Sequence, residues 1–313
     1  MKIFVSGSLA YDRIMDFPGK FSDYILPEKI HVLNVCFAVS GVIERFGGTA
    51  GNIAYGLVQL GEKPIIVAAA GRDFDIYRAH IKEQGLSDES IRLVPEELTA
   101  GAYITTDQLN NQITGFNMGA MKYSTAYDFS REDAKQSICI IAPGNLDDMK
   151  NYALSCRSSG LPYIFDPGQS LTAWSGPALV DALTGAAIFI SNDYELEMTM
   201  KITGLTQEDI IARTGTVIVT MGENGSQVFN AKDRIAICPV PPDRVVDPTG
   251  AGDTYRAGLL KGLKEGMDTV DAARLGAVLA SFAVEVQGTQ EYRATRDTIG
   301  YRYEAAFGRA LNW

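Results

Sequence analysis

A glycine-rich segment followed by an aspartate stands in the last third of the chain, where residues 245–258 read VVDPTGAGDTYRAG. Gly250 and Gly252 let the backbone turn sharply before a stretch with the pattern of an amphipathic helix. We therefore expect the N–H groups of Gly250, Ala251 and Gly252 to converge at the helix N-terminus, where the helix dipole favours an anion such as phosphate. Asp253 lies at that same point. An aspartate in a first helical turn is often only a cap, but beside a phosphate its carboxylate can take a proton from an attacking hydroxyl.

Two polar residues early in the chain have the chemistry to meet a substrate that carries hydroxyl groups. Asn52 follows Gly47 and Gly48 at the start of a helix-like stretch. Its amide could bridge two vicinal hydroxyls, or it could be an ordinary polar residue of a helix start. Asp12 follows the first apolar run, in the region where open α/β sheets bind ligands, or it forms only a turn.

Two further motifs have the residue types of a nucleotide and metal site. Asn192 and Glu195 stand at the start of a helix-like stretch, where Glu195 could help to position hydrated magnesium or could only complement the helix dipole. Thr220 and Gly222 end an apolar run, and Gly225 precedes the predicted hairpin 226–240. Glycines at such a place serve a tight turn, and they also let a nucleotide approach the backbone.

Together these motifs resemble the ribokinase, or PfkB, family of carbohydrate and nucleoside kinases. DPTGAGD at 247–253 resembles the C-terminal signature of the family, and GGTAGN at 47–52 resembles its N-terminal G-G-x-x-x-N signature. NDYE at 192–195 is similar to the N-x-x-E motif, and TMGENG at 220–225 is similar to the T-x-G-x-x-G loop near the nucleotide. Asp12 resembles the acidic residue that holds substrate hydroxyls. The motifs occur in the family's order across nearly the whole chain.

The resemblance implies phosphoryl transfer from ATP, with Mg²⁺ and a monovalent cation such as K⁺ as cofactors. Asp253 would be the catalytic base, and Gly250, Ala251 and Gly252 would form the anion hole. The remaining implied residues are Asp12, Gly47, Gly48, Asn52, Gln112 and Phe116 for the substrate; Asn192, Thr220, Gly222 and Gly225 for ATP; Glu195 for Mg²⁺, held indirectly; and Asp247 and Thr249, together with Gly288, for the monovalent cation.

The elements that must position these residues alternate along the chain. Short, continuously apolar runs are typical of strands buried on both faces of a parallel sheet, and the stretches between them have helical patterns. We therefore predict one α/β domain over 1–313, with a doubly wound, mostly parallel sheet flanked by helices. The resemblance implies that this fold is ribokinase-like. The apolar runs are 64–71, 139–144, 163–168, 186–192 and 216–222, and the expected helices are 147–159, 177–184, 193–201, 252–266, 270–285 and 295–310.

Two segments break the alternation. Residues 30–46 and 101–118 have the pattern of β-hairpins without an intervening helix. We expect them to form a small β lid, built from roughly 13–46 and 98–122, although an antiparallel extension of a sheet edge explains the pattern equally well. Exposed edge strands in such a lid could pair with a second copy of the chain, which would give a homodimer.

The predicted lid also bears on the substrate. Residues 101–119 contain no Lys or Arg, and a substrate that already carries phosphate would need a cationic clamp. Apolar side chains in the lid could cover a flat base or pack only against one another: Phe37, Val39, Phe116 and Met118.

DPGQ at 166–169 and GAGDTYRAG at 250–258 are similar to nucleoside kinases of the archaeal and bacterial PfkB branch, adenosine kinase-like enzymes in which Gln112 would face the base. We expect a kinase that phosphorylates the 5′-hydroxyl of a purine nucleoside such as adenosine, inosine or guanosine. A ribokinase- or fructokinase-type sugar kinase and a non-catalytic ligand-binding protein on the same fold are the alternatives.

Composition excludes several other classes. A net charge of −10 over 313 residues argues against a nucleic-acid partner. Four widely spaced cysteines and two histidines offer no zinc pattern, and no apolar run reaches the length of a membrane span. The N-terminus has no secretory pattern, so we expect a cytoplasmic protein without a membrane partner. The sequence also lacks a P-loop motif and the G-x-G-x-x-G dinucleotide fingerprint.

Overall fold

The apolar runs form the central sheet of the protein. The computed structural model describes residues 1–311 and 313, and within them nine strands pair in the order β13-β12-β11-β10-β9-β8-β1-β4-β5. The strands are parallel except that β12 runs antiparallel to β11 and β13, which confirms the predicted mostly parallel sheet. The strands are β1 (Lys2–Ser6), β4 (Ile65–Gly71), β5 (Ile91–Val94), β8 (Ser137–Ile141), β9 (Tyr163–Phe165), β10 (Ile188–Asn192), β11 (Thr216–Thr220), β12 (Ser226–Asn230) and β13 (Arg234–Ile237).

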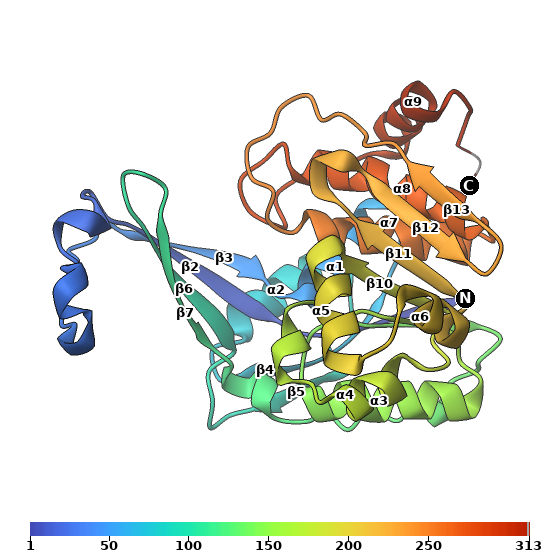
Figure 1. Ribbon diagram of the computed structural model, residues 1–313, viewed down its shortest axis with the longest axis horizontal. Coiled ribbons are helices and arrows are strands. Elements are labelled where there is room, and N and C mark those ends of the chain that lie inside the picture. The colour runs from blue at the N-terminus through green and yellow to red at the C-terminus, as the bar shows by residue number, and fades with distance from the viewer. Residues whose placement is uncertain (312) are drawn as a thin grey trace.

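Both faces of this sheet are buried, which explains why its strands are apolar without alternation. In β1, Ile3 and Val5 pack into one core, and Phe4 between them packs into the other. Helices α1, α2, α7, α8 and α9 cover the first face, and α3, α4, α5 and α6 cover the second (Figure 1). The helices are α1 (Thr49–Gln59), α2 (Asp75–Glu83), α3 (Leu146–Ser159), α4 (Gly176–Leu183), α5 (Asp193–Thr203), α6 (Gln207–Thr214), α7 (Ala251–Lys264), α8 (Thr269–Ala283) and α9 (Arg296–Phe307).

A second, smaller sheet projects from the body of the molecule as a lid, at the left of Figure 1. Within the described residues its four strands have the order β3-β2-β6-β7. β2 and β6 are parallel, whereas β2 and β3, and β6 and β7, form antiparallel pairs. The ribbon predicted at 101–118 is therefore present as β6 and β7. The lid strands are β2 (Ala10–Asp16), β3 (Val42–Gly47), β6 (Ala100–Thr106) and β7 (Gln112–Asn117).

The hairpin predicted at 30–46 was wrong. The 3₁₀ helix η2 (Pro27–Val32) and an irregular segment occupy most of it, and only its end forms β3, which pairs with β2. Phe37 of this segment packs against an aromatic cluster at the tip of the lid, whereas Ile30 and Val32 are exposed. The cluster consists of Phe17, Phe21, Tyr24 and Phe37. The other 3₁₀ helices are η1 (Phe21–Asp23), η3 (Gly119–Lys122), η4 (Phe129–Arg131), η5 (Gly168–Ala173) and η6 (Gly222–Asn224).

Two glycines set the position of α7, the helix that begins beside Asp253. A Cβ on Gly258 of α7 would lie 2.6 Å from the Cα of Gly276 in α8, and a Cβ on Gly276 would lie 2.6 Å from the carbonyl oxygen of Tyr255. The two helices therefore pack backbone against backbone. Within residues 1–311 and 313, no helix is long and apolar enough to cross a membrane.

We expect Gly258→Ala to lower the free energy of unfolding by about 1–3 kcal/mol, because the added methyl must push α7 and α8 apart. Gly300→Ala in α9 is the matched control: a Cβ there meets nothing within 4 Å, so it should be neutral or should stabilise the helix by up to about 1 kcal/mol. Urea denaturation measures both. Equal stability of the two variants would contradict the close approach of α7 and α8.

Candidate active site

The N-terminus of α7 has the donors of an anion site. Gly250 is its N-cap with φ of 78°, and no side chain caps the helix. The N–H of Ala251 donates to the carbonyl of Pro248 at 3.2 Å, so one of the three expected donors is engaged in a turn. Within the described residues, the N–H groups of Gly250 and Gly252 have no acceptor inside the chain. These two groups are free to donate to an anion.

Asp253 does not cap its own helix. Its Oδ2 accepts a hydrogen bond of 2.8 Å from Nδ2 of Asn52, in the first turn of α1. Burial raises the pKa of Asp253 to about 6, against the opposing effects of the Arg256 guanidinium and the Asn52 hydrogen bond. A carboxyl group with such a pKa is ionised at neutral pH and remains basic enough to accept a proton.

Arg256, one turn after Asp253, forms a buried ion pair with Asp166 at the end of β9. Nη2 of Arg256 donates to Oδ1 of Asp166 at 3.0 Å, and Nε donates to Oδ2. The two side chains are only 7% and 2% exposed. Removing either partner would leave the other charge buried and unpaired, which is strongly destabilising. The pair therefore anchors the start of α7 to the carboxyl edge of the sheet.

Asp12 lies in the lid strand β2, and not at the end of a main-sheet strand as the sequence suggested. It reaches the start of α1: a Cβ on Gly47 would lie only 2.5 Å from Oδ2 of Asp12. Gly48, with φ of 87°, would bring a Cβ within 2.6 Å of the carbonyl oxygen of Ser8, so both glycines allow close approach. Burial, with a smaller effect from the charge of Asp247, raises the pKa of Asp12 to about 6.

The strand register places three expected substrate residues on one face of the lid. Asp12 pairs with Ala102, and Ala102 pairs with Phe116, so these side chains form one row. Gln112 is four residues from Phe116 on the same strand and therefore faces the same way, roughly 13 Å farther along. Its Nε2 donates to Oγ1 of Thr106 at 3.3 Å.

The apolar residues expected to cover a base divide into two groups. Phe37 belongs to the aromatic cluster at the lid tip and packs against Phe17 at a ring-centroid distance of 4.8 Å. It therefore serves the lid's own core, the alternative that the sequence left open. Phe116 and Met118 are 53% and 43% exposed, and Val39 is exposed as well. Apolar surface remains available on the lid.

The expected nucleotide residues cluster where β10 and β11 end. The Asn192 side chain accepts from the N–H of Glu195 at 2.7 Å, and Oε2 of Glu195 accepts from the N–H of Asn192 at 2.8 Å. These bonds form a capping box at the start of α5. Gly225, with φ of 82°, would bring a Cβ within 2.2 Å of the Ile237 carbonyl oxygen, so the β12–β13 hairpin itself requires a glycine.

Thr220 and Gly222 lie beside that hairpin. Oγ1 of Thr220 donates to the carbonyl of Ser191 at 3.4 Å. Gly222 has φ of 55°, and a Cβ there would meet open space. The end of β11 therefore has open space beside the backbone of Gly222.

Asp247 joins the expected monovalent-cation residues. Its Oδ1 accepts from the N–H of Thr249 at 2.9 Å, and its Oδ2 accepts from the N–H of Gly288 at 3.1 Å. The desolvation of Asp247 is outweighed by these hydrogen bonds and by Arg45, so its pKa lies below the ordinary value. Among residues 1–311 and 313, no group of three or more His, Cys, Asp or Glu side chains could hold a metal ion. A cation here would depend on backbone carbonyls, water and phosphate.

Three residues of the site were missed from the sequence. Gln290 contacts Asn52, Tyr77 and His80, and Tyr77 donates to the carbonyl of Gly47 at 2.8 Å. They come from α2 and from the loop after α8, outside all of the recognised motifs. Only the tertiary structure brings them to Asp253.

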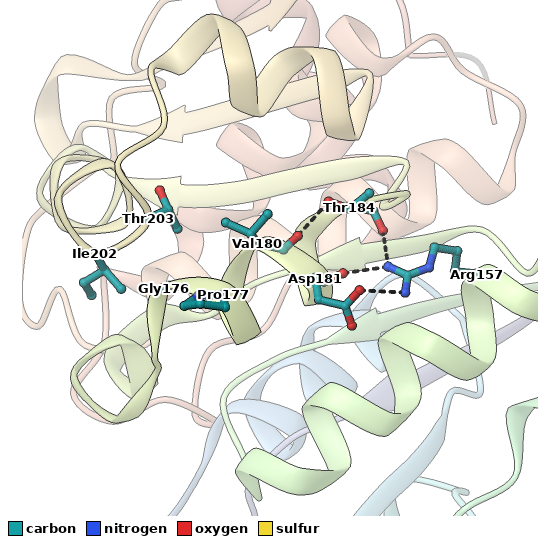
Figure 2. Close-up of a pocket in the computed structure, with 8 residues that line it drawn as sticks. All are labelled: Arg157, Gly176, Pro177, Val180, Asp181, Thr184, Ile202 and Thr203. Atoms are coloured by element: carbon teal, nitrogen blue, oxygen red, sulfur yellow. Dashed lines mark hydrogen bonds and ion pairs between the residues drawn. The ribbon is translucent and has the colours of Figure 1, made fainter.

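A separate surface cavity lies among α3, α4 and α5 (Figure 2). Arg157 is the charged side chain that dominates it, but its guanidinium donates to Asp181 and to the carbonyl of Thr184. None of the described residues that line the cavity is one of the expected site residues. This cavity is not part of the candidate active site.

A doubly wound α/β sheet with a β lid, and a basic carboxylate beside free N–H groups at a helix start, define a phosphotransferase of the ribokinase-like fold. The chain belongs to the PfkB carbohydrate kinase family, because the model of that family, pfkB family carbohydrate kinase, matches residues 21–296.

Relatives of known structure and function agree with this assignment. The chain is 32% identical to a nucleoside kinase of Methanocaldococcus jannaschii over 285 residues, which cover 90% of this chain and 93% of that protein. It is similar to the structure of Burkholderia thailandensis nucleoside kinase in complex with inosine, with a TM-score of 0.87, 36% identity, and coverage of 98% of this chain and 99% of that one. The same Burkholderia protein in complex with ADP-inosine matches with a TM-score of 0.86, 37% identity, and coverage of 99% and 97%.

We expect kcat/KM for phosphoryl transfer to fall steeply below about pH 6, because both Asp253 and Asp12 have pKa values of about 6 in the free protein and both would act as carboxylates. Because both carboxylates become protonated, kcat/KM should fall by up to about a hundredfold per pH unit below about pH 6. In Asp12→Asn only Asp253 still titrates, so the slope should fall to about tenfold per pH unit. Protonation of ATP affects wild type and Asp12→Asn equally, so it does not change the difference between their slopes. Identical slopes would contradict the raised pKa of Asp12.

Proposed function

We propose that this protein is an ATP-dependent kinase that phosphorylates the 5′-hydroxyl of a purine nucleoside. The observation that carries the proposal is the pairing of Asn52 with Asp253 beside the free N–H groups of Gly250 and Gly252. It unites a hydroxyl-binding amide, a base and an anion site where the N-termini of α1 and α7 meet. The inosine-bound Burkholderia structure supports a nucleoside as the acceptor.

In the proposed reaction, Asp12, Gly48 and Asn52 hold the ribose hydroxyls, and the lid covers the base. Asp253 takes the 5′-hydroxyl proton as that oxygen forms a bond to the γ-phosphorus of ATP. The bond from the γ-phosphorus to the oxygen of the leaving ADP breaks. The N–H groups of Gly250 and Gly252 stabilise the charge on the transferring phosphoryl oxygens.

The cation requirements follow from the same geometry. Glu195 is partly committed to its capping box, so it would act on Mg²⁺ through water, as the sequence suggested. Burial raises the pKa of Glu195, and a nearby cation would favour its ionised form. Mg²⁺ would neutralise phosphate charge. Asp247, whose oxygens are held by the N–H groups of Thr249 and Gly288, would orient the backbone around K⁺ and supply negative charge.

The lid face supports a neutral substrate over a sugar phosphate. Asp12, Ile14 and Ile104 lie on the face that also carries Phe116, so a carboxylate for hydroxyls adjoins apolar side chains suited to a base. Arg45 is in the same row as Asp12, but it forms an ion pair with Glu291 at 3.5 Å. Arg45, the main candidate partner for a phosphate on the substrate, is therefore already paired with Glu291.

The lid also supports a homodimer as a further proposal. Strands β3 and β7 are the edges of the lid sheet, and exposed apolar residues lie on them and on the preceding segment. A second copy could pair with such an edge and cover that surface. These residues include Val42, Ile43, Ile113, Ile30, Val32 and Leu33.

We expect Asp253→Asn to lower kcat by roughly 10²–10⁴, the usual contribution of a positioned general base, while the Kd values for ATP and nucleoside change only a few-fold. Asp268→Asn is the matched control, because Asp268 only caps α8, accepting from the N–H of Asp271 at 2.8 Å. Stopped-flow and calorimetric measurements separate turnover from binding. Turnover of Asp253→Asn within about fivefold of wild type would return Asp253 to a structural role, and an inactive wild type would favour the ligand-binding alternative.

We expect kcat/KM for at least one purine nucleoside to exceed that for ribose or fructose by about 10² or more, because a free sugar leaves the apolar lid face wet. Gln112→Ala should narrow that ratio without changing the Kd of ATP, since it removes a donor and an acceptor that can pair with a purine edge. Ile113→Ala, at the next residue on the opposite lid face, should leave the ratio unchanged. Equal or better use of a free sugar would establish the sugar-kinase alternative.

A further inference from the structure

A continuous chain of hydrogen bonds runs from Asp253 into the protein. Nδ2 of Asn52 lies 2.8 Å from Oδ2 of Asp253, and Nε2 of Gln290 lies 3.0 Å from Oδ1 of Asn52. Nε2 of Gln290 also lies 2.8 Å from the hydroxyl of Tyr77, and that hydroxyl lies 2.8 Å from the carbonyl oxygen of Gly47. A branch joins Oε1 of Gln290 to Nε2 of His80 at 3.0 Å. Asn52, Tyr77 and Gln290 are buried.

The hydrogen bonds of this chain all run in one donor-to-acceptor direction, which the carbonyl of Gly47 fixes. A backbone carbonyl only accepts hydrogen bonds, so the Tyr77 hydroxyl donates its single proton to the carbonyl of Gly47. The hydroxyl must then accept from the amide group of Gln290, whose second N–H points to Asn52. Asn52 accepts through Oδ1, which leaves its own NH₂ group facing Asp253. His80 completes the set by donating to Oε1 of Gln290.

The direction distinguishes the two oxygens of Asp253. Oδ2 faces a donor, so a proton on Oδ2 would require Asn52 and Gln290 to turn over. After that reversal, Tyr77 would donate to Oε1 of Gln290, and the Gly47 carbonyl would lose its donor. An unpaired buried carbonyl is costly.

We propose that Gln290 and Tyr77 are positioning residues that hold this chain in one direction, so that Oδ1 of Asp253 is the oxygen that takes the substrate proton. The inference rests on the proposed kinase function, within which it assigns the base to one oxygen. It also explains why two buried polar side chains outside the family motifs lie behind the catalytic carboxylate.

Other charged groups around Asp253 act through space and are independent of the chain. Arg256 belongs to the same helix, Asp166 follows β9 and Glu195 begins α5. Tyr292, in the loop after α8, is a further titratable neighbour. Variants of the chain that keep these charges isolate the effect of hydrogen-bond direction on the pKa of Asp253.

The first test removes the proton that fixes the direction. In Tyr77→Phe the reversed chain becomes accessible, so the protonated form of Asp253 gains a partner, and the apparent pKa of the acid limb of kcat/KM should rise by roughly half to one pH unit, the effect of one neutral hydrogen bond. Tyr55→Phe is the matched control, because the buried Tyr55 hydroxyl donates to the carbonyl of Tyr292 at 2.7 Å but lies outside the chain. Both variants should lower Tm similarly, and only Tyr77→Phe should raise the apparent pKa of the acid limb of kcat/KM.

A second variant reverses the direction outright. Gln290→Glu keeps the shape of the side chain but only accepts when ionised, so Asn52 must turn its oxygen toward Asp253. The rise in the pKa of Asp253 should exceed that in Tyr77→Phe, because the added negative charge also raises this pKa. Tyr77→Phe therefore remains the variant that isolates hydrogen-bond direction. The pKa of Asp253 is also read without substrate from the ¹³C resonance of its carboxyl carbon, assigned with Asp253→Asn, so the chain is tested even if the protein phosphorylates no nucleoside. Matching titrations of wild type and Tyr77→Phe would overturn the inference and leave the proposed function standing, whatever the shift in Gln290→Glu.

Discussion

The hydrogen bond between Asn52 and Asp253 joins residues 201 positions apart, and most of the fold serves to make it possible. Asn52 stands in the first turn of α1 and Asp253 in the first turn of α7, so two helix N-termini must meet at the carboxyl edge of the sheet. The close packing of α7 on α8 and the buried Arg256–Asp166 pair hold one side of this contact. The proposed anion site, the raised pKa of Asp253 and the proposed hydroxyl-binding role of Asn52 all depend on that meeting of helices.

The sequence predicted the main sheet and its helices well, because each element has a local signature. Continuous apolar runs such as 216–222 need burial on both faces, and glycine-rich turns such as that before Asp253 mark helix starts. It predicted the lid less well, because only the end of 30–46 pairs as a strand. Phe37 packs against aromatic residues outside that segment, and Ile30 and Val32 are exposed. An apolar sequence pattern does not show which residues a segment packs against. Gln290 and Tyr77 had no signal at all, since their importance arises only from contacts with residues far along the chain.

Several residues of the candidate site have structural roles beside the chemical roles proposed for them. Gly225 is required by a hairpin, Glu195 completes a capping box and Asp247 holds two backbone N–H groups. The sequence posed these as alternatives to functional roles, but a loop that must approach phosphate also has to be shaped. A residue that fixes backbone N–H groups in place preorganises the donors on which electrostatic stabilisation depends. For these positions the structural interpretation and the proposed functional one are compatible.

The location of Asp12 on the lid, with Asp253 on the body, bears on how such an enzyme treats water. A water molecule in the position of the attacking hydroxyl would contact only the body, near Asp253. In the proposed reaction a nucleoside would contact both parts at once, so its ribose would join two carboxylates from different sheets. Binding energy from the lid would then favour the nucleoside over water as the phosphoryl acceptor. The division of the proposed site between two sheets would in this way limit wasteful ATP hydrolysis.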